Sequence, residues 1–202
     1  MFSAIFFIIF LGLSYLAGSV CSAVIVSNLC KLPDPRAEGS KNPGATNVLR
    51  LAGKKYAAIV LLADMLKGFL PVVIARMFGY EAFALGCVCL ATVIGHLYPY
   101  FFDFKGGKGV ATALGALFGI NFVLGLICTI LWILIAVISK YSSLASIVVL
   151  LAAPLLSLKY HPSISAFLPL LIMSFFVVYR HQANFVRLQQ GTESKIDFGK
   201  KS

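Results

Sequence analysis

The sequence has few charged residues and very few acidic ones. Of its 202 residues only 12% are charged, and Asp and Glu together number 7. Soluble domains carry about 25% charged residues, so a water-solvated globular surface is excluded. Residues 1–13 also lack Lys and Arg, so the basic start of a secretory signal peptide is missing. We therefore expect the first apolar stretch to remain in the protein as a membrane span.

The cysteines show no metal-site pattern. The chain has 5 of them, an odd number, and no CxxC pair. Zinc sites and disulfide frameworks have recognisable cysteine spacings, which are missing here. We expect small buried side chains at these positions, and neither a metal nor a cofactor.

Apolar residues dominate what is present. They make up 60% of the chain, and the mean hydropathy is +0.94. A helix needs about 20 apolar residues to cross a bilayer, and helices are the default because lipid offers the backbone no hydrogen-bonding partner. The candidate spans are residues 2–28, 56–78, 82–101, 121–139, 142–158 and 163–179.

The interval 109–139 is short for two full helices. A break at Gly119, Ile120 and Asn121 suggests a short or half-buried helix over 110–118 before the span that follows. This predicts an all-α integral membrane protein of about seven transmembrane helices, with the N-terminus outside and the C-terminus cytoplasmic. The alternative is one long tilted helix, which would move the C-terminal tail to the opposite face.

The 17 Lys and Arg give a net charge of +10, and they lie mainly between the spans. Basic residues can bind nucleic acid through its phosphates. Here they flank membrane-length segments, so the positive-inside rule explains them better, and no nucleic acid partner is expected. We expect one domain over residues 1–202, with polar segments 39–50, 95–112 and 181–193 all on the cytoplasmic side.

The first polar segment is rich in groups that can bind an oxyanion. Hydroxyls, amides, a guanidinium and exposed backbone N–H groups can converge on one. A turn-rich linker that starts a helix near Ala45 is the alternative. The candidate residues are Ser40, Asn42, Thr46, Asn47 and Arg50.

The second polar segment combines glycines with lysines. Gly106, Gly107 and Gly109 allow the backbone close to a ligand, and a helix N-terminus beside Lys108 favours an anion. The P-loop spacing is absent, so ATP binding is not supported. Alternatively, the lysines only set the membrane topology.

The third polar segment places His181, Asn184 and Arg187 at i, i+3 and i+6, on roughly one face if the helix continues. An anchor at the interface, with Arg180 and His181 solvated, is the alternative. In the second span, Asp64 and Lys67 are three apart and would pair, either as structural glue or in support of the site.

Together the three segments resemble the motifs of the bacterial acyl-phosphate-dependent glycerol-3-phosphate acyltransferases, the PlsY family. The resemblance spans nearly the whole chain, and the runs FKGGKGVAT and NPGATN are highly specific. It implies a seven-span fold of the cytoplasmic (inner) membrane with a cytoplasmic-face site. It also implies transfer of an acyl group from acyl phosphate to the sn-1 hydroxyl of glycerol 3-phosphate, the first step of phospholipid synthesis.

The resemblance also implies roles for individual residues. Those expected around glycerol 3-phosphate are Ser40, Arg50, Lys108, His181 and Asn184, of which Arg50, Lys108 and His181 are the catalytic candidates. Those expected around a long-chain acyl phosphate are Lys105, Gly106, Gly107, Gly109, Asn42, Thr46 and Asn47. Those expected to support the site are Asp64, Lys67, His96, Ser143, Arg187 and Glu193.

Three questions stay open at this stage. The base could be His181, whose reference pKa of about 6.5 suits neutral pH, or the substrate's own phosphate. The donor could be a thioester. The chain could instead be a small transporter of an organic phosphate, although the polar residues gather at one face rather than at mid-membrane. We expect a monomer.

Overall fold

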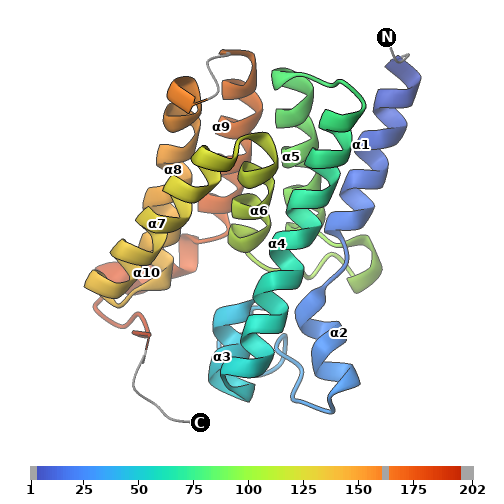
Figure 1. The fold of residues 1–202 in the computed structure, drawn as a ribbon. Helices are drawn as coiled ribbons and strands as arrows, with labels where there is room; N and C mark the ends of the chain where they lie inside the picture. The colour runs from blue at the N-terminus through green and yellow to red at the C-terminus, as the bar shows by residue number, and fades with distance from the viewer. Residues whose placement is uncertain (1–3, 161–163, 197–202) are drawn as a thin grey trace.

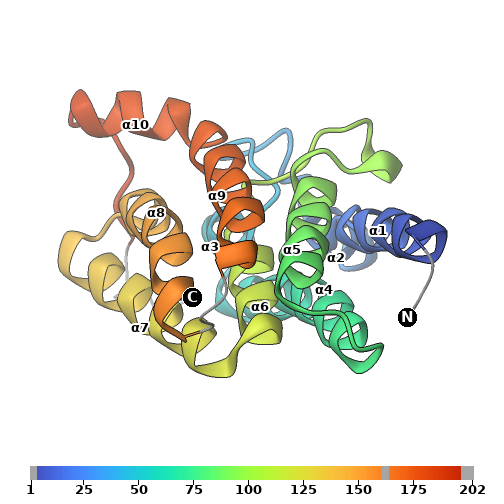
Figure 2. The same ribbon diagram turned by 90° about the horizontal axis from the view of Figure 1, so that it is seen from above.

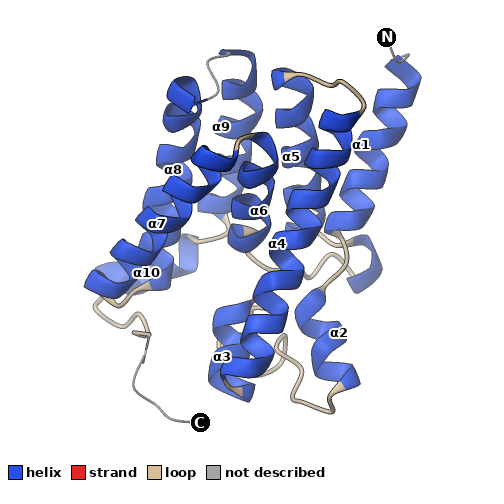
Figure 3. Cartoon of the chain, in the orientation of Figure 1, coloured by secondary structure: helices blue, strands red, loops and turns tan. Residues whose placement is uncertain are grey.

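The computed structural model describes residues 4–160 and 164–196, and all regular structure in these ranges is helical (Figures 1 and 3). The predicted starts of the first and last spans, at residues 2 and 163, lie outside the described residues. In chain order the elements are α1 (Ala4–Gly18), α2 (Ser22–Leu29), α3 (Ala45–Ala52), α4 (Lys54–Met77), α5 (Ala82–Leu97), the 3-10 turn η1 (Tyr100–Phe102), α6 (Val110–Ile120), α7 (Phe122–Ser139), α8 (Ser142–Tyr160), α9 (Ile164–Tyr179) and α10 (Gln182–Gln189).

Four segments of the described chain are each long and apolar enough to cross a membrane alone: α4, α5 continued through η1, α7 and α8. Two further pairs qualify only as bent units, α1 with α2 at 42° and α9 with α10 at 57°. The short helix predicted over 110–118 corresponds to the shorter apolar helix α6. The predicted all-helical fold is therefore confirmed. The first predicted span is wrong in one respect, since it is broken after Gly18.

The short helix α6 resolves the interval that was too short for two spans. Asn121 has an extended backbone, and its Oδ1 accepts a hydrogen bond from the backbone N of Leu124 at 3.0 Å. This cap ends α6 and starts α7, so the alternative of one long tilted helix is wrong. Eight of the 11 residues of α6 are buried, and the helix lies between α4 and α7 (Figure 2). Because neighbouring helices cover α6 on most of its surface, it does not need the length of a full membrane-spanning helix.

Helices α4 and α6 approach each other backbone to backbone. A Cβ at Gly68 would overlap the carbonyl oxygen of Thr112, and one at Gly115 would overlap that of Met65. Small residues permit such contacts between membrane helices, where van der Waals packing replaces the hydrophobic effect. The packing fixes the start of α6, and with it the preceding glycine-rich loop, against α4.

The three polar segments lie at one end of the bundle, away from the start of α1 (Figure 1). Two long-range hydrogen bonds at this end hold residues 194–196, which directly follow the third polar segment. The backbone N of Ile196 donates to the carbonyl of Lys140 at 2.7 Å, and Nη2 of Arg50 donates to the carbonyl of Ser194 at 3.4 Å. The predicted gathering of the motifs at one end of the bundle is thus present.

Candidate active site

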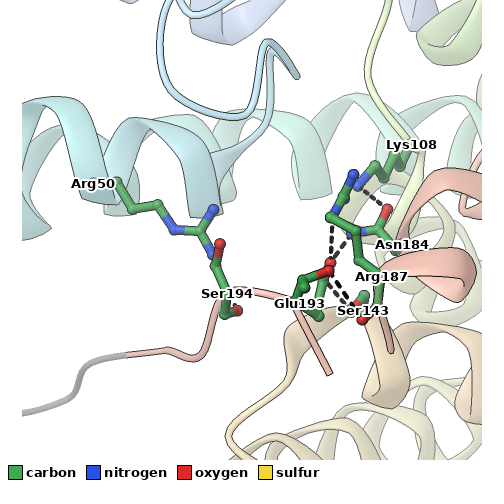
Figure 4. Close-up of polar contacts among 8 residues, drawn as sticks. Arg50, Lys108, Ser143, Asn184, Arg187, Glu193 and Ser194 are labelled. Atoms are coloured by element: carbon green, nitrogen blue, oxygen red, sulfur yellow. Dashed lines mark hydrogen bonds and ion pairs between the residues drawn. The ribbon is translucent and has the colours of Figure 1, made fainter. Parts of the chain in front are cut away.

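Glu193 is the centre of a polar cluster that ties the C-terminal segment to α8 and α10 (Figure 4). Its Oε1 accepts hydrogen bonds from Ser143 Oγ at 2.7 Å and Asn184 Nδ2 at 2.6 Å, and its Oε2 pairs with Arg187 Nε at 2.7 Å. Burial opposes ionisation, but these three donors outweigh it and hold the pKa of Glu193 below its usual range. Ser143, predicted as a support, is therefore joined directly to the third polar segment.

Lys108 reaches into the same cluster from the glycine-rich loop. Its Nζ donates to Asn184 Oδ1 at 2.5 Å, so Asn184 bridges Lys108 and Glu193. Burial lowers the pKa of Lys108 to about 8, and the positive charges of Arg187 and Arg50 act in the same direction, while Glu193 opposes them. At neutral pH the ammonium is still mostly charged, with donors left for an anion.

Arg50 approaches the cluster from the first polar segment. It lies on α3 with an exposed side chain, and it points toward the backbone of Ser194, next to Glu193 (Figure 4). Ser40 is exposed in the same segment, and Asn42 and Thr46 are half-buried. A cationic side chain from the first polar segment thus joins the group formed by the second and third.

His181 lies just beyond the end of the apolar helix α9 and is 2% exposed. Its Nδ1 is 2.7 Å from the carbonyl oxygen of Val177. A carbonyl only accepts, so Nδ1 carries the hydrogen and Nε2 is left as an acceptor. Burial lowers the pKa of His181 to about 4, against the opposing effect of the Val177 hydrogen bond. The imidazole is therefore neutral at physiological pH.

The glycines of the second segment are required by packing. A Cβ at Gly106 would overlap the carbonyl of His96, and one at Gly107 would overlap its ring nitrogen Nε2. Gly109 has a φ of +81°, which favours glycine. The Gly107 amide, predicted as a donor to acyl phosphate, is not available, because it donates to the carbonyl of His96 at 3.2 Å.

Asn47 was predicted to bind acyl phosphate, but its side chain bonds the backbone of its own loop. Its Oδ1 accepts from the backbone N of Ser40 at 2.9 Å, and its Nδ2 donates to the carbonyls of Pro35 and Glu38, each at 3.0 Å. Both amide hydrogens are thereby used, and the side chain is 1% exposed. Asn47 shapes the loop that presents Ser40.

Arg180 has a role that the sequence did not indicate, and the alternative in which it is a solvated anchor is not what the structure shows. Its Nη2 donates to the carbonyl of Gly106 at 3.0 Å and its Nε to that of Gly107 at 3.4 Å, while the guanidinium lies over the ring of Tyr98, 5.5 Å from its centroid. These contacts hold the glycine-rich loop in addition to the bond from the Gly107 amide to the His96 carbonyl. No sequence spacing relates positions 106 and 180, so only the fold reveals this contact.

A buried polar network lies behind the loop. Lys67 Nζ pairs with Asp64 at 2.8 Å and donates at 2.6 Å to the carbonyl of Val20, which the break between α1 and α2 exposes. His96 Nδ1 is 3.7 Å from Asp64 Oδ1 and 3.1 Å from Thr112 Oγ1. Charged groups within a membrane bundle need such partners. Through His96 the network meets the glycine-rich loop.

Within the described ranges, no group of three or more His, Cys, Asp or Glu is arranged to hold a metal ion. The cluster around Lys108 and Asn184 instead combines cations and an amide with the carboxylate of Glu193.

Comparison with known proteins identifies the family. Residues 8–191 match the profile of the family described as glycerol-3-phosphate acyltransferase. The glycerol-3-phosphate acyltransferase of Legionella pneumophila (strain Lens) is 49% identical over 193 residues, which cover 96% of this chain and 70% of that protein. This chain belongs to the glycerol-3-phosphate acyltransferase family. The family's protein from Francisella tularensis subsp. holarctica (strain OSU18) is 46% identical over 183 residues, covering 91% of this chain and 89% of that one.

Solved structures agree with this membership. A crystal structure of PlsY, an integral membrane glycerol 3-phosphate acyltransferase in its glycerol 3-phosphate form, superposes with a TM-score of 0.89 at 38% identity, covering 95% of this chain and 96% of that one. The lysophosphatidic acid form gives a TM-score of 0.87 at 37% identity, covering 95% of each chain. The family resemblance found in the sequence is confirmed, and the chain is a multi-pass, all-helical integral membrane acyltransferase.

Proposed function

We propose that this chain transfers a fatty acyl group from acyl phosphate to the sn-1 hydroxyl of glycerol 3-phosphate, giving 1-acyl-glycerol 3-phosphate (lysophosphatidic acid) and inorganic phosphate. The observation that carries the proposal is the Lys108, Asn184 and Glu193 chain at one end of an apolar bundle, with Arg50 facing it. Such a site offers cations to a phosphate while the membrane holds an acyl tail. The related solved structures, described as glycerol 3-phosphate and lysophosphatidic acid forms, support the same acceptor and product.

The acceptor is expected between the first and third polar segments. The phosphate of glycerol 3-phosphate would take charge-assisted hydrogen bonds from Arg50 and Lys108. Ser40, His181 and Asn184 would bind the remaining oxygens. Lys108 has donors beyond the one used on Asn184, so binding need not break the Glu193 cluster.

The reaction needs alignment more than a protein nucleophile. An acyl phosphate is a mixed anhydride with an activated carbonyl. The acceptor hydroxyl oxygen forms a bond to the carbonyl carbon, the tetrahedral oxyanion collapses, and the bond from that carbon to the phosphate oxygen breaks. The protein supplies positioning of two anions that repel each other, together with donors to the oxyanion. Lys105, Gly106 and Gly109, with Asn42 and Thr46, stay our candidates near the donor.

The acceptor's own phosphate is the better proton acceptor. A phosphate monoester has its second pKa near about 6, whereas burial holds the pKa of His181 at about 4. A base with the lower pKa is protonated less readily at neutral pH. His181 Nε2 can still accept a hydrogen bond from the hydroxyl and orient it, so we assign His181 as an orienting residue.

The donor is tested by incubating the purified chain with glycerol 3-phosphate and either palmitoyl phosphate or palmitoyl-CoA. We expect lysophosphatidic acid and phosphate from the first mixture alone. Product from the thioester alone would overturn the donor assignment. If neither donor gives product and proteoliposomes exchange labelled glycerol 3-phosphate across the bilayer, the chain is a transporter and the proposal fails.

We also propose that residues 1–202 act as one domain and as a monomer in the bacterial cytoplasmic membrane, with the site facing the cytoplasm. The positive-inside rule supports this orientation. Lys54, Lys140 and Arg180 lie at helix ends on the side of the site, whereas Arg76 and Lys159 lie at the opposite ends of α4 and α8.

A further inference from the structure

A second basic pocket adjoins the glycine-rich loop. It encloses about 280 Å³ and shares no residue with the Lys108, Asn184 and Glu193 cluster. It opens beside the loop that follows α2. Its lining residues are Arg36, Lys41, Pro43, Phe104, Lys105, Gly106 and Arg180.

Four of the lining residues are cations, and two of these already have partners. Arg36 pairs with Asp34 at 2.8 Å, and Arg180 donates to loop carbonyls. Lys41 and Lys105 are exposed, and within the described ranges neither forms an ion pair. The pocket therefore has excess positive charge, with two ammonium groups available to an anion.

Exposed aromatic rings continue from one wall of the pocket. Phe104 lines it, and the Tyr100 ring lies 6.2 Å from the Phe104 ring and 5.6 Å from that of Phe101. All three side chains are more than half exposed. Exposed aromatic rings beside cations are typical of the membrane–water interface. The pocket thus has the composition of a site at the level of the lipid headgroups.

Two lining residues have an unusual backbone conformation. Lys41 has a φ of +55° and Phe104 one of +56°, a region that non-glycine residues rarely occupy. Such conformations persist only where the surroundings impose them, and they concentrate at binding sites. Here they occur on two loops that meet at the same pocket.

We propose that this pocket binds the phosphate of an anionic phospholipid headgroup from the surrounding bilayer. Lys41 and Lys105 donate to the phosphate oxygens, Arg36 and Arg180 add positive charge, and Phe104 contacts the glycerol and the first acyl carbons. Basic pockets at the ends of membrane helices suit anionic headgroups for these reasons. The pocket shares Lys105 and Gly106 with the residues proposed near the acyl donor, so the bound lipid lies at the edge of the acyltransferase site. Lys41 has no proposed role in the reaction.

The test is lipid retention by the purified full-length chain. Phosphatidylglycerol is titrated in detergent, and bound lipid is counted by native mass spectrometry. Lys41→Asn removes one charge while keeping a residue that tolerates a positive φ, and we expect about fivefold weaker binding, the effect of one lysine near an anionic surface. Lys31→Asn is the matched control, because Lys31 is also exposed, has a φ of +54° and does not line the pocket.

The outcomes distinguish a lipid headgroup from inorganic phosphate and from the acyl donor as the group that the pocket binds. Wild-type binding in Lys31→Asn and in Lys41→Arg, with loss only in Lys41→Asn, supports the headgroup site. Equal binding by Lys41→Asn and Lys31→Asn overturns it. So does displacement of phosphatidylglycerol by millimolar inorganic phosphate, which would make the pocket a free phosphate site. A raised KM for palmitoyl phosphate in Lys41→Asn with unchanged lipid retention would assign the pocket to the acyl donor and also overturn the proposal.

Discussion

Lys108 is half-buried and yet carries a charge at neutral pH. Asn184 accepts one of its hydrogens, and Glu193 lies one hydrogen bond further on, so the ammonium is compensated without a direct salt bridge. A direct carboxylate partner would compete with an anionic substrate. The indirect arrangement leaves the positive charge available to a phosphate.

Replacing Lys108 should therefore weaken binding of the transition state. For Lys108→Met we expect kcat/KM to fall about 10²–10³-fold, the usual cost of removing one electrostatic group from such a site. Lys54→Met, which removes an exposed lysine at the start of α4, is the control and should keep wild-type turnover. Lysophosphatidic acid formation is measured at equal amounts of membrane-inserted protein. Wild-type turnover in Lys108→Met would remove Lys108 from the site.

The pKa of Lys108 also predicts a pH dependence. A lysine with its pKa lowered to about 8 is charged below that pH and neutral above it. Binding of glycerol 3-phosphate needs the positive charge of Lys108. We therefore expect kcat/KM for glycerol 3-phosphate to be constant near neutral pH and to fall above about pH 8, with a slope that approaches a tenfold loss per pH unit. Arginine stays charged throughout this range, so any residual activity of Lys108→Arg should lack the alkaline fall. A flat wild-type profile to about pH 9.5 would contradict this assignment.

At the scale of elements, the glycine-rich loop is held by a backbone carbonyl at the end of α5 and by a side chain that follows α9. The backbone carbonyl of His96, at the end of α5, accepts from the Gly107 amide, and Arg180 after α9 donates to the carbonyls of Gly106 and Gly107. The loop is thereby fixed by both its amide and its carbonyl groups, and Lys108 directly after Gly107 has a defined direction. The glycines allow this close packing.

This explanation is tested at Gly107. An alanine Cβ there would overlap the His96 ring, so the loop must shift in Gly107→Ala. We expect at least a tenfold loss of kcat/KM, since small displacements of positioned groups reduce rates by about that much or more. Gly12→Ala is the matched control, because nothing lies within 4 Å of a Cβ at Gly12. If both variants keep full activity, the close packing of the loop is irrelevant to catalysis.

At the scale of the whole molecule, the three polar segments gather at one end of the helical bundle. The start of α1 lies at the other end (Figure 1). The main polar exception is the Asp64 and Lys67 pair, which joins α4 to the break after α1 and, through His96, to the site. The bundle is thus both the membrane anchor and the support of the site.

Labelling can determine the orientation. In a background without the native cysteines, Ser40→Cys and Gln190→Cys should react with an impermeant maleimide only from the cytoplasmic side. Glu81→Cys, at the opposite end and exposed, should react from outside. The labelling is done on intact cells and on inside-out vesicles. Labelling of Ser40→Cys and Gln190→Cys from opposite sides would contradict the arrangement, and outside labelling of both would reverse the proposed orientation.

The sequence by itself determined the class of protein, the positions of most helices and the family. The membrane spans can be recognised from the length of the uncharged apolar runs. The family motifs are contiguous runs of residues, so spans and motifs are both local properties of the sequence. The cap at Asn121 and the start of α3 at Ala45 could also be predicted from the sequence, because they depend on neighbouring residues.

Only the tertiary structure decided which polar atoms are free. Asn47 and the Gly107 amide appeared available in the sequence, yet both are committed within the fold. The sequence allowed Arg180 to be a solvated anchor, yet it donates to a loop more than seventy positions away. Hydrogen bonds between distant segments depend on how helices pack, and helix packing in a membrane is set by close contacts such as those at Gly68 and Gly115 rather than by local pattern.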